Sequence, residues 1–352
     1  MLESSVSKCE KTPWLRARRW LGFFMLIIIG TSILIICNSN MQVSWSLNVW
    51  TIRSHSNMTT SVSNISAANP SSSKYFVAYP HQYHFILDEP NRCRQESPFL
   101  VLMIPVSPHN REARDTIRNT WGKEVSVLGR AVSHYFLLGM SKEEDETELL
   151  KEQVLQESQR HHDILRSNFV DSYNNLTIKT MVIFEWLDSH CPNTSYAMKI
   201  DSDMFLNVHK LVDMLSTARQ NLYMTGLVAR HAAVLRDYNS KWFLPVSAFS
   251  ESTYPPYAMG LGYVFSLDLA KKILEASKHV KAIYIEDVYV GLCMQYLGIA
   301  HTDPPHGGLF RATIPGSTTN CYWTSVITTI LQSSNQLSEV WKSYQTQVQS
   351  GC

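Results

Sequence analysis

The pattern of apolar and polar positions divides the chain into four segments. Trp20 to Cys37 is an apolar run without a charge, close to the roughly 20 residues that a helix needs to cross a bilayer. Residues 38–90 are rich in Ser, Asn and Thr and lack periodic apolar positions, so they cannot bury enough surface to offset the entropy of ordering. We therefore expect a terminal tail at 1–19, a transmembrane helix at 20–37, a flexible stem at 38–90 and one globular domain at 91–352.

The globular segment has the pattern of an α/β fold. Apolar runs of strand length at 99–104, 131–139, 195–200 and 222–228 alternate with longer segments of helical spacing. Because these runs are continuously apolar, the sheet should be covered by helices on both faces. Ligands of such sheets bind at the carboxyl ends of the strands, so functional residues should follow strands. The acidic stretch at 143–157 is interpreted as a solvated helix face.

Charge gives the orientation of the predicted membrane helix and limits the partners. Five basic residues precede the apolar run, and the next one after it is Arg53, so residues 1–19 should be cytosolic and the remainder luminal. A cleaved signal peptide or a buried core helix is the alternative. Membrane lipid is thus an expected partner, whereas a net charge of +1 without long basic runs in the C-terminal two-thirds disfavours nucleic acid.

Sequons and cysteines agree with a luminal domain. Four N-x-[ST] sequons are candidates for N-glycosylation: Asn57, Asn64, Asn175 and Asn193. Five cysteines follow the apolar run: Cys93, Cys191, Cys293, Cys321 and Cys352. Because five is odd, at least one thiol must stay outside intramolecular disulfides. None of the cysteines has the CxxC spacing that is typical of zinc sites.

Two aspartates follow the strand-like run from Tyr196 to Ile200, in the motif Asp201-Ser202-Asp203. Residues two apart on an extended chain point the same way, so both carboxylates can share a hard cation such as Mg²⁺ or Mn²⁺. Such a cation would stabilise a departing nucleoside diphosphate. The alternative is that the aspartates form a turn, or cap a helix that starts near Asn207.

A second acid pair, Glu286 and Asp287, follows a short apolar run and precedes a helical pattern. A carboxylate in this position could accept a proton from a sugar hydroxyl as general base. The alternative is an N-cap that only satisfies orphan amides and the helix dipole.

Two further segments suggest ligand contacts. Arg114 and Arg118 share one face of a helix, and arginine suits phosphate recognition, with surface ion pairs to Glu112 or Asp115 as the alternative. Residues 254–263 are rich in aromatic residues, Pro and Gly, which predicts a loop that lines a sugar pocket or a tight turn.

Five motifs, taken in order, resemble those of the β1,3-galactosyltransferase family, and the resemblance runs from about residue 91 to 352. They are R-x-x-I-R-x-T-W (114–121), D-S-Y-N-N-L-T-I-K-T (171–180), K-I-D-S-D-M-F-L-N (199–207), Y-P-P-Y-A-M-G-L-G-Y (254–263) and E-D-V-Y-V-G-L-C (286–293). The resemblance implies a GT-A (Rossmann-like) fold with a mixed central sheet flanked by helices. It also implies a type II Golgi membrane enzyme that transfers galactose from UDP-galactose, with inversion and with Mn²⁺ or Mg²⁺, to a terminal N-acetylhexosamine of a glycoprotein or glycolipid.

The resemblance also implies residue roles. Asp203 is similar to the principal metal ligand, Asp201 faces the metal and the nucleotide sugar, and Asp287 is similar to the general base. The positions implied in donor binding are Arg114, Arg118, Asp171, Lys179, Asp201, Ser202, Gly260, Gly262 and Glu286. A β1,3-N-acetylglucosaminyl- or N-acetylgalactosaminyltransferase is the alternative enzyme, and a catalytically silent Golgi protein that binds glycans or partner enzymes is the alternative of another class.

Three positions depart from the family pattern. Ile330 stands where relatives have a histidine that completes the metal site, and isoleucine cannot coordinate a metal. Tyr-Ala-Met-Gly-Leu-Gly stands at 257–262 where galactosyl relatives usually have F-C-S-G-T-G, and 304–322 lacks their N-H-W pattern.

Overall fold

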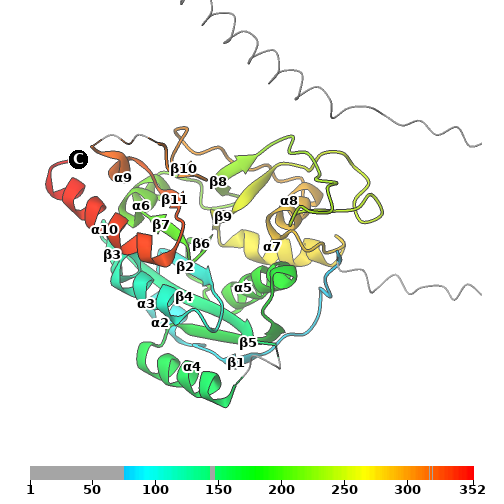
Figure 1. Ribbon diagram of the computed structural model, residues 1–352, viewed down its shortest axis with the longest axis horizontal. Coiled ribbons are helices and arrows are strands. Elements are labelled where there is room, and N and C mark those ends of the chain that lie inside the picture. The colour runs from blue at the N-terminus through cyan, green and yellow to red at the C-terminus, as the bar shows by residue number, and fades with distance from the viewer. Residues whose placement is uncertain (1–74, 143–146, 317, 319) are drawn as a thin grey trace, which may run out of the picture. The chain divides into compact units, whose positions relative to one another are not determined.

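The computed structural model describes residues 75–142, 147–316, 318 and 320–352 (Figure 1). The predicted cytosolic tail, the transmembrane segment at 20–37 and the sequons Asn57 and Asn64 lie outside the described residues. Within the described ranges, no helix is both long enough and apolar enough to span a bilayer.

A mixed sheet runs through the centre of the domain. Its strands lie in the order β1 (Phe85–Leu87), β5 (Ile164–Val170), β4 (Arg130–Met140), β2 (Leu100–Pro105), β6 (Tyr196–Ile200), β9 (Tyr257–Ser266) and β8 (Met224–Ala229), and β3 (Ser126–Val127) pairs with β4. β5, β4, β2 and β6 are parallel to one another, whereas β1, β9 and β8 each pair antiparallel. The four strands predicted from apolar runs are confirmed as β2, β4, β6 and β8.

Helices cover both faces of this sheet (Figure 1). Side chains alternate along β2, so that Leu100, Leu102 and Ile104 join one core cluster while Val101 and Met103 join the other. The first cluster includes residues of α3 (Arg111–Asn119), α4 (Glu148–His161), α6 (Val208–Ser216) and α10 (Ser334–Gln349). The second includes residues of α5 (Leu176–His190), α7 (Asp268–Ser277) and α8 (Glu286–Tyr296). The predicted α/β fold with a sheet covered on both faces is therefore confirmed.

A small second sheet lies beside the first. It consists of β10 (Phe310–Arg311), β11 (Thr328–Ile330) and β7 (Met204–Leu206), with β11 antiparallel to β7. Short helices α2 (Arg92–Glu96), η2 (Trp121–Lys123), η3 (Tyr173–Asn175) and α9 (Tyr322–Ser325) complete the described elements.

The folded domain begins earlier than the sequence predicts. β1 pairs with β5 at the edge of the main sheet, Phe76 bridges to Ile283, and the Trp186 indole N–H donates to Asp88 at 2.8 Å. Residues 75–90 are therefore part of the domain rather than of the stem, and the predicted boundary at residue 91 is corrected. The segment escaped recognition because its strand is only three residues long.

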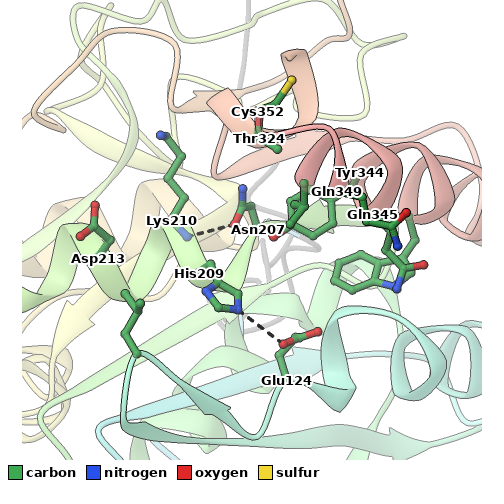
Figure 2. Close-up of a pocket in the computed structure, with 13 residues that line it drawn as sticks. Glu124, Asn207, His209, Lys210, Asp213, Thr324, Tyr344, Gln345, Gln349 and Cys352 are labelled. Carbon is green, nitrogen blue, oxygen red and sulfur yellow. Dashed lines mark hydrogen bonds and ion pairs between the residues drawn. The ribbon is translucent and has the colours of Figure 1, made fainter. Parts of the chain in front are cut away.

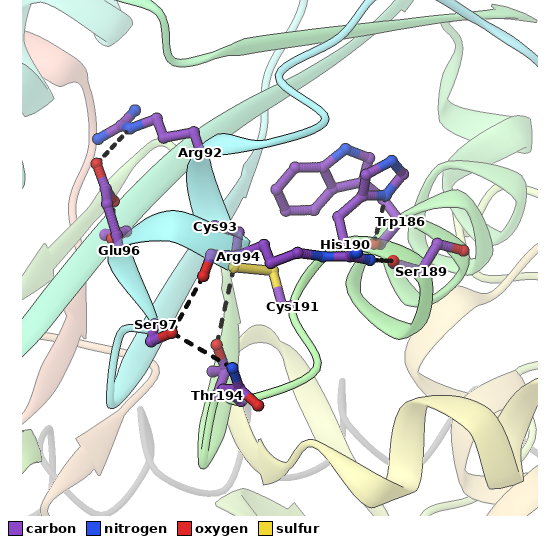
Figure 3. Close-up of a disulfide and its surroundings, with 12 residues drawn as sticks. Arg92, Cys93, Arg94, Glu96, Ser97, Trp186, Ser189, His190, Cys191 and Thr194 are labelled. Carbon is purple, nitrogen blue, oxygen red and sulfur yellow. Dashed lines mark hydrogen bonds and ion pairs between the residues drawn. A yellow bond between two sulfur atoms is a disulfide. The ribbon is translucent and has the colours of Figure 1, made fainter.

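Two disulfide bonds cross-link the domain. Cys93 of α2 is bonded to Cys191 at the end of α5, as Figure 3 shows, and Cys321 is bonded to Cys352. Among the described cysteines, Cys293 is buried and free, which confirms that one thiol stays unpaired.

Replacing Cys93 and Cys191 together by Ser should lower the free energy of unfolding by about 2–5 kcal/mol, because the disulfide closes a long loop in the unfolded chain. Chemical denaturation measures this difference. Cys293→Ala, which leaves both disulfides intact, is the comparison. A double variant that unfolds at the same denaturant concentration as the parent chain would show that the bond adds no stability.

Candidate active site

The carboxyl ends of the four parallel strands meet at one edge of the sheet, and charged residues gather there. Asp171 follows β5, and its backbone N–H donates to Met140 at the end of β4 at 2.7 Å. Lys179 of α5 donates to Asp171 at 2.6 Å and to the Val106 carbonyl beyond β2 at 2.9 Å. Burial lowers the pKa of Lys179, although Asp171 opposes the shift. The predicted residues Asp171 and Lys179 therefore lie together, and their hydrogen bonds link the carboxyl ends of β5, β4 and β2.

The aspartates of the Asp201-Ser202-Asp203 motif follow β6 at the same edge. Asp201 Oδ1 accepts from Lys199 Nζ at 2.7 Å, and Ser202 is half-buried in the turn that leads to β7. Although Asp203 is exposed, the surrounding protein and then the neighbouring charge of Asp201 raise its pKa. Neither aspartate caps the next helix, because Asn207 does so by accepting from the Lys210 N–H at 2.9 Å.

Glu286 and Asp287, the second acid pair, are the first two residues of α8, as predicted. Lys199 links them to the first pair, because it contacts both Asp201 and Glu286. Both oxygens of Asp287 accept backbone N–H groups, from Gly260 at 2.9 Å and from Val288 at 2.9 Å. The buried Glu286 accepts from the Tyr263 hydroxyl at 2.7 Å. Burial raises the pKa of both carboxyl groups. The N-cap of α8 is Ile285, and the two acids lie in the first turn. Asp287 nevertheless accepts the otherwise free Val288 N–H there, so this carboxylate also stabilises the start of the helix, as the alternative interpretation predicted.

Glycines let β9 approach these acids closely. The predicted loop at 254–263 is wrong from Tyr257 onward, because that segment is strand β9 between β6 and β8. A Cβ on Gly260 would lie 2.9 Å from Glu286 Oε2, and one on Gly262 would lie 3.2 Å from Met198 Cε. A side chain at position 260 would therefore displace the acid pair.

Lys199 is the positive centre of the cluster, and the sequence did not single it out. Its ammonium donates to Asp201 and to the Gly260 carbonyl, and lies 3.5 Å from Glu286. Burial disfavours its charge, but the carboxylates of Asp201 and Glu286 outweigh this and hold the pKa of Lys199 above its usual range. The available signal was a lone lysine within an otherwise apolar strand. We call Lys199, Asp201, Glu286 and Asp287 the acid cluster.

The predicted arginines lie in an ion-pair network on the face of the sheet that α3 and α4 cover, whereas α8 covers the other face. Arg114 is fully buried and directs its donors to Glu157 at 2.7 and 2.8 Å and to the carbonyls of residues 107 and 108. Arg118 pairs with Asp115, Glu157 and Asp163, each at 2.7 Å. Arg114 has no donor left for a phosphate, so the donor-binding role predicted for it could only be indirect, through the position of residues 107–108. The solvated-face interpretation of 143–157 is wrong for Glu157, which is buried.

The structure also shows what could hold a divalent cation. The described residues include no group of three or more His, Cys, Asp or Glu side chains placed to hold a metal ion. Ile330 pairs with Met204, and the adjacent Leu331 N–H donates to the Asp203 carbonyl at 2.9 Å, so position 330 does lie beside the aspartates. Carboxylate oxygens such as those of Asp201 and Asp203 are the ligand type that Mg²⁺ prefers, so a cation held by these two residues would take its other ligands from phosphate and water.

A separate pocket of about 560 Å³ lies between α6 and α10 (Figure 2). His209 and Glu124 both line it and lie 3.8 Å apart, and Asn207, at the far end of β7 from Asp203, also lines it. No residue of the acid cluster lines this pocket.

Comparisons with known proteins place the chain in a family. A family model described as Galactosyltransferase matches residues 112–305, which include the whole acid cluster. Beta-1,3-galactosyltransferase 2 of Pongo abelii is 37% identical over 281 residues, covering 78% of this chain and 66% of that protein. Beta-1,3-galactosyltransferase 1 of Mus musculus is 41% identical over 223 residues, covering 62% of this chain and 67% of that protein. The chain therefore belongs to the galactosyltransferase family, and it spans about two thirds of the length of these relatives.

Among solved structures, the WbbM bifunctional glycosyltransferase apo structure overlaps 71% of this chain and 52% of its own, with 11% identity and a TM-score of 0.38. This likeness is too weak to carry an argument.

Proposed function

We propose that the chain transfers galactose from UDP-galactose to the 3-hydroxyl of a terminal N-acetylhexosamine, preferably N-acetylglucosamine, on a glycoprotein or glycolipid. The observation that carries the proposal is the acid cluster at the carboxyl edge of the sheet, in a chain that belongs to the galactosyltransferase family. The mixed sheet covered by helices on both faces supports a GT-A fold.

The donor nucleotide would lie over the carboxyl ends of the parallel strands, where α/β sheets bind their ligands. Asp171 and Lys179 fix the shape of this edge. Asp201 and Asp203 would hold Mn²⁺ or Mg²⁺, and the cation would supply positive charge near the leaving diphosphate. Gly260, Gly262 and Glu286 would frame the sugar.

Asp287 would act as general base. Its two backbone hydrogen bonds fix the orientation of the carboxylate, and its raised pKa strengthens it as a proton acceptor. Asp287 takes the proton of the acceptor hydroxyl while that oxygen forms a bond to C1 of galactose. The bond between C1 and the β-phosphate oxygen breaks, and its electron pair leaves with UDP. A single displacement of this kind inverts C1.

We further propose a single-pass type II arrangement in the Golgi membrane with this domain in the lumen. The apolar run at 20–37 and the basic residues before it support this topology. The two disulfides suit an oxidising compartment. Of the sequons in the described part, Asn193 is exposed, whereas the Asn175 amide donates to the Val170 carbonyl at 2.8 Å.

Rates of transfer by the full-length chain from UDP-galactose, UDP-N-acetylglucosamine and UDP-N-acetylgalactosamine test this function. We expect UDP-galactose to be the fastest donor, chelator to abolish transfer, and added Mn²⁺ to restore it. A faster N-acetylhexosamine donor would favour the alternative enzyme. Absence of transfer from every donor would favour a silent glycan-binding protein, an alternative that Ile330 motivates.

A further inference from the structure

Two large aromatic side chains are exposed on the surface and held together by a lysine. Tyr173 is 45% exposed and Trp242 is 47% exposed. The ammonium of Lys241 lies 4.5 Å from the centroid of the Trp242 ring and 5.9 Å from that of Tyr173. These three residues, from two segments far apart in the sequence, form one unit that we call the aromatic platform.

The aromatic platform is attached to the segment that carries the catalytic acids. The Tyr284 hydroxyl donates to the carbonyls of Phe243 at 2.7 Å and Lys241 at 3.0 Å. The Tyr284 ring also contacts the Tyr173 ring edge-on, with centroids 6.5 Å apart. Because Tyr284 stands two residues before Glu286, the platform is fixed beside the acid cluster.

Charges on both acid pairs act on the aromatic platform, which agrees with this placement. Partial burial and then the charge of Asp287 raise the pKa of Tyr173, and Asp201 adds to the shift. The Lys241 charge in turn acts on Asp203, whose pKa it lowers against the larger influences that raise it.

The segment that carries Trp242 is ordered by its own contacts. The Leu244 N–H donates to the Leu235 carbonyl at 3.0 Å, and Arg236 donates to the carbonyls of Phe249 and Glu251, each at 2.8 Å. Two neighbouring exposed rings give more apolar surface than a scattered single residue, and apolar patches rimmed by polar groups occur at ligand-binding grooves.

The chemistry of the aromatic platform suits a pyranose ring. Tyr and Trp present an apolar face with a polar edge, and a pyranose has an apolar C–H face with hydroxyl groups around its rim. Lys241 adds a hydrogen-bond donor at the boundary between the two rings. An aromatic surface with few polar groups is what small-molecule sites usually offer.

The position relative to the sheet separates acceptor from donor. The donor nucleotide of the proposed function would lie over the ends of the parallel strands β5, β4, β2 and β6. Trp242 lies on the connection between β8 and β9, the antiparallel strands beyond β6. We propose that Tyr173, Lys241 and Trp242 form a subsite for a pyranose ring of the acceptor glycan. The identification of that glycan as the acceptor rests on the proposed function.

Kinetics of the full-length chain test this subsite. Trp242→Ala should raise the KM for an N-acetylglucosamine-terminated trisaccharide about tenfold, with the KM for UDP-galactose unchanged. Trp242→Phe, which keeps a ring, should retain most of the affinity. Tyr238→Ala is the matched control, because Tyr238 is 82% exposed on the same segment but stacks on Phe243. An unchanged acceptor KM in Trp242→Ala, or a raised donor KM instead, would overturn the subsite.

Binding without donor separates the subsite from catalysis. Saturation-transfer NMR of trisaccharides that end in N-acetylglucosamine or N-acetylgalactosamine should show contact with the wild-type chain that Trp242→Ala loses. If wild type transfers no sugar but shows this difference, the proposed function fails and the subsite stands. Equal signals from wild type and Trp242→Ala, or no signal from either, contradict the subsite whether or not transfer occurs.

Discussion

Asp287→Asn is expected to lower the turnover number for sugar transfer by about 10²- to 10⁴-fold, because an amide cannot take the proton of the acceptor hydroxyl. UDP affinity should stay nearly unchanged, since the predicted nucleotide contacts lie over the parallel strands. Initial rates at saturating substrates measure the first quantity, and calorimetric titration with UDP measures the second. Asp188→Asn, which changes an exposed aspartate of α5, is the matched control.

The same substitution should change the stability of the fold only slightly, because two effects oppose each other. Burial raises the pKa of Asp287, so the folded chain binds its proton more tightly than the unfolded chain does, and stability falls as the pH rises through that window. The amide of Asp287→Asn is uncharged, which removes this loss, but it has one oxygen where the carboxylate has two, so either the Gly260 or the Val288 N–H loses its acceptor. The melting temperature of the variant should therefore stay within about 5 °C of that of wild type. Unchanged turnover would remove Asp287 from the mechanism, whereas lost turnover with a much lower melting temperature would point to misfolding.

Lys199→Met should lower the free energy of unfolding by about 3–5 kcal/mol and abolish transfer, because it leaves the buried Glu286 carboxylate and the partly exposed Asp201 without their positive partner. Chemical denaturation gives the stability change. Lys278→Met is the matched control, since Lys278 pairs with Glu275 at 2.8 Å on the surface, and it should leave the denaturation midpoint nearly unchanged.

A second substitution separates lost charge from lost packing. Adding Glu286→Gln to Lys199→Met removes one uncompensated charge, so it should restore part of the lost stability. No recovery in the double variant would mean that Lys199 acts through packing alone.

Elements that depend on local patterns were predictable from the sequence. Continuous apolar runs identified β2, β4, β6 and β8, and the acid pairs were correctly expected after a strand and at the start of a helix. Both signals come from neighbouring residues along the chain.

Features that depend on tertiary pairing were not predictable. The contacts of Lys199 with Gly260 and Glu286 span 61 and 87 positions, and only the meeting of β6, β9 and α8 creates them. The prolines and glycines of 254–263 indicated a loop, but pairing on both sides made a strand of the segment from Tyr257 onward.

A single buried position within a polar helix is equally hard to recognise. Glu157 lies in an acidic stretch whose other charges give no reason to expect burial. Its burial is explained by its ion pairs with Arg114 and Arg118 of α3. The helix that carries the arginines was predicted correctly, but Glu157, the partner of Arg114, lies 43 positions further along the chain.

The measurement that tests the central claim most directly is sugar transfer by the purified full-length chain from UDP-galactose to an N-acetylglucosamine-terminated acceptor, with Asp287→Asn in parallel. The account predicts a product heavier by one hexose from wild type, formed only with a divalent cation, and none at a comparable rate from Asp287→Asn. Equal product from both proteins, or none from wild type with any UDP-sugar donor, would contradict it.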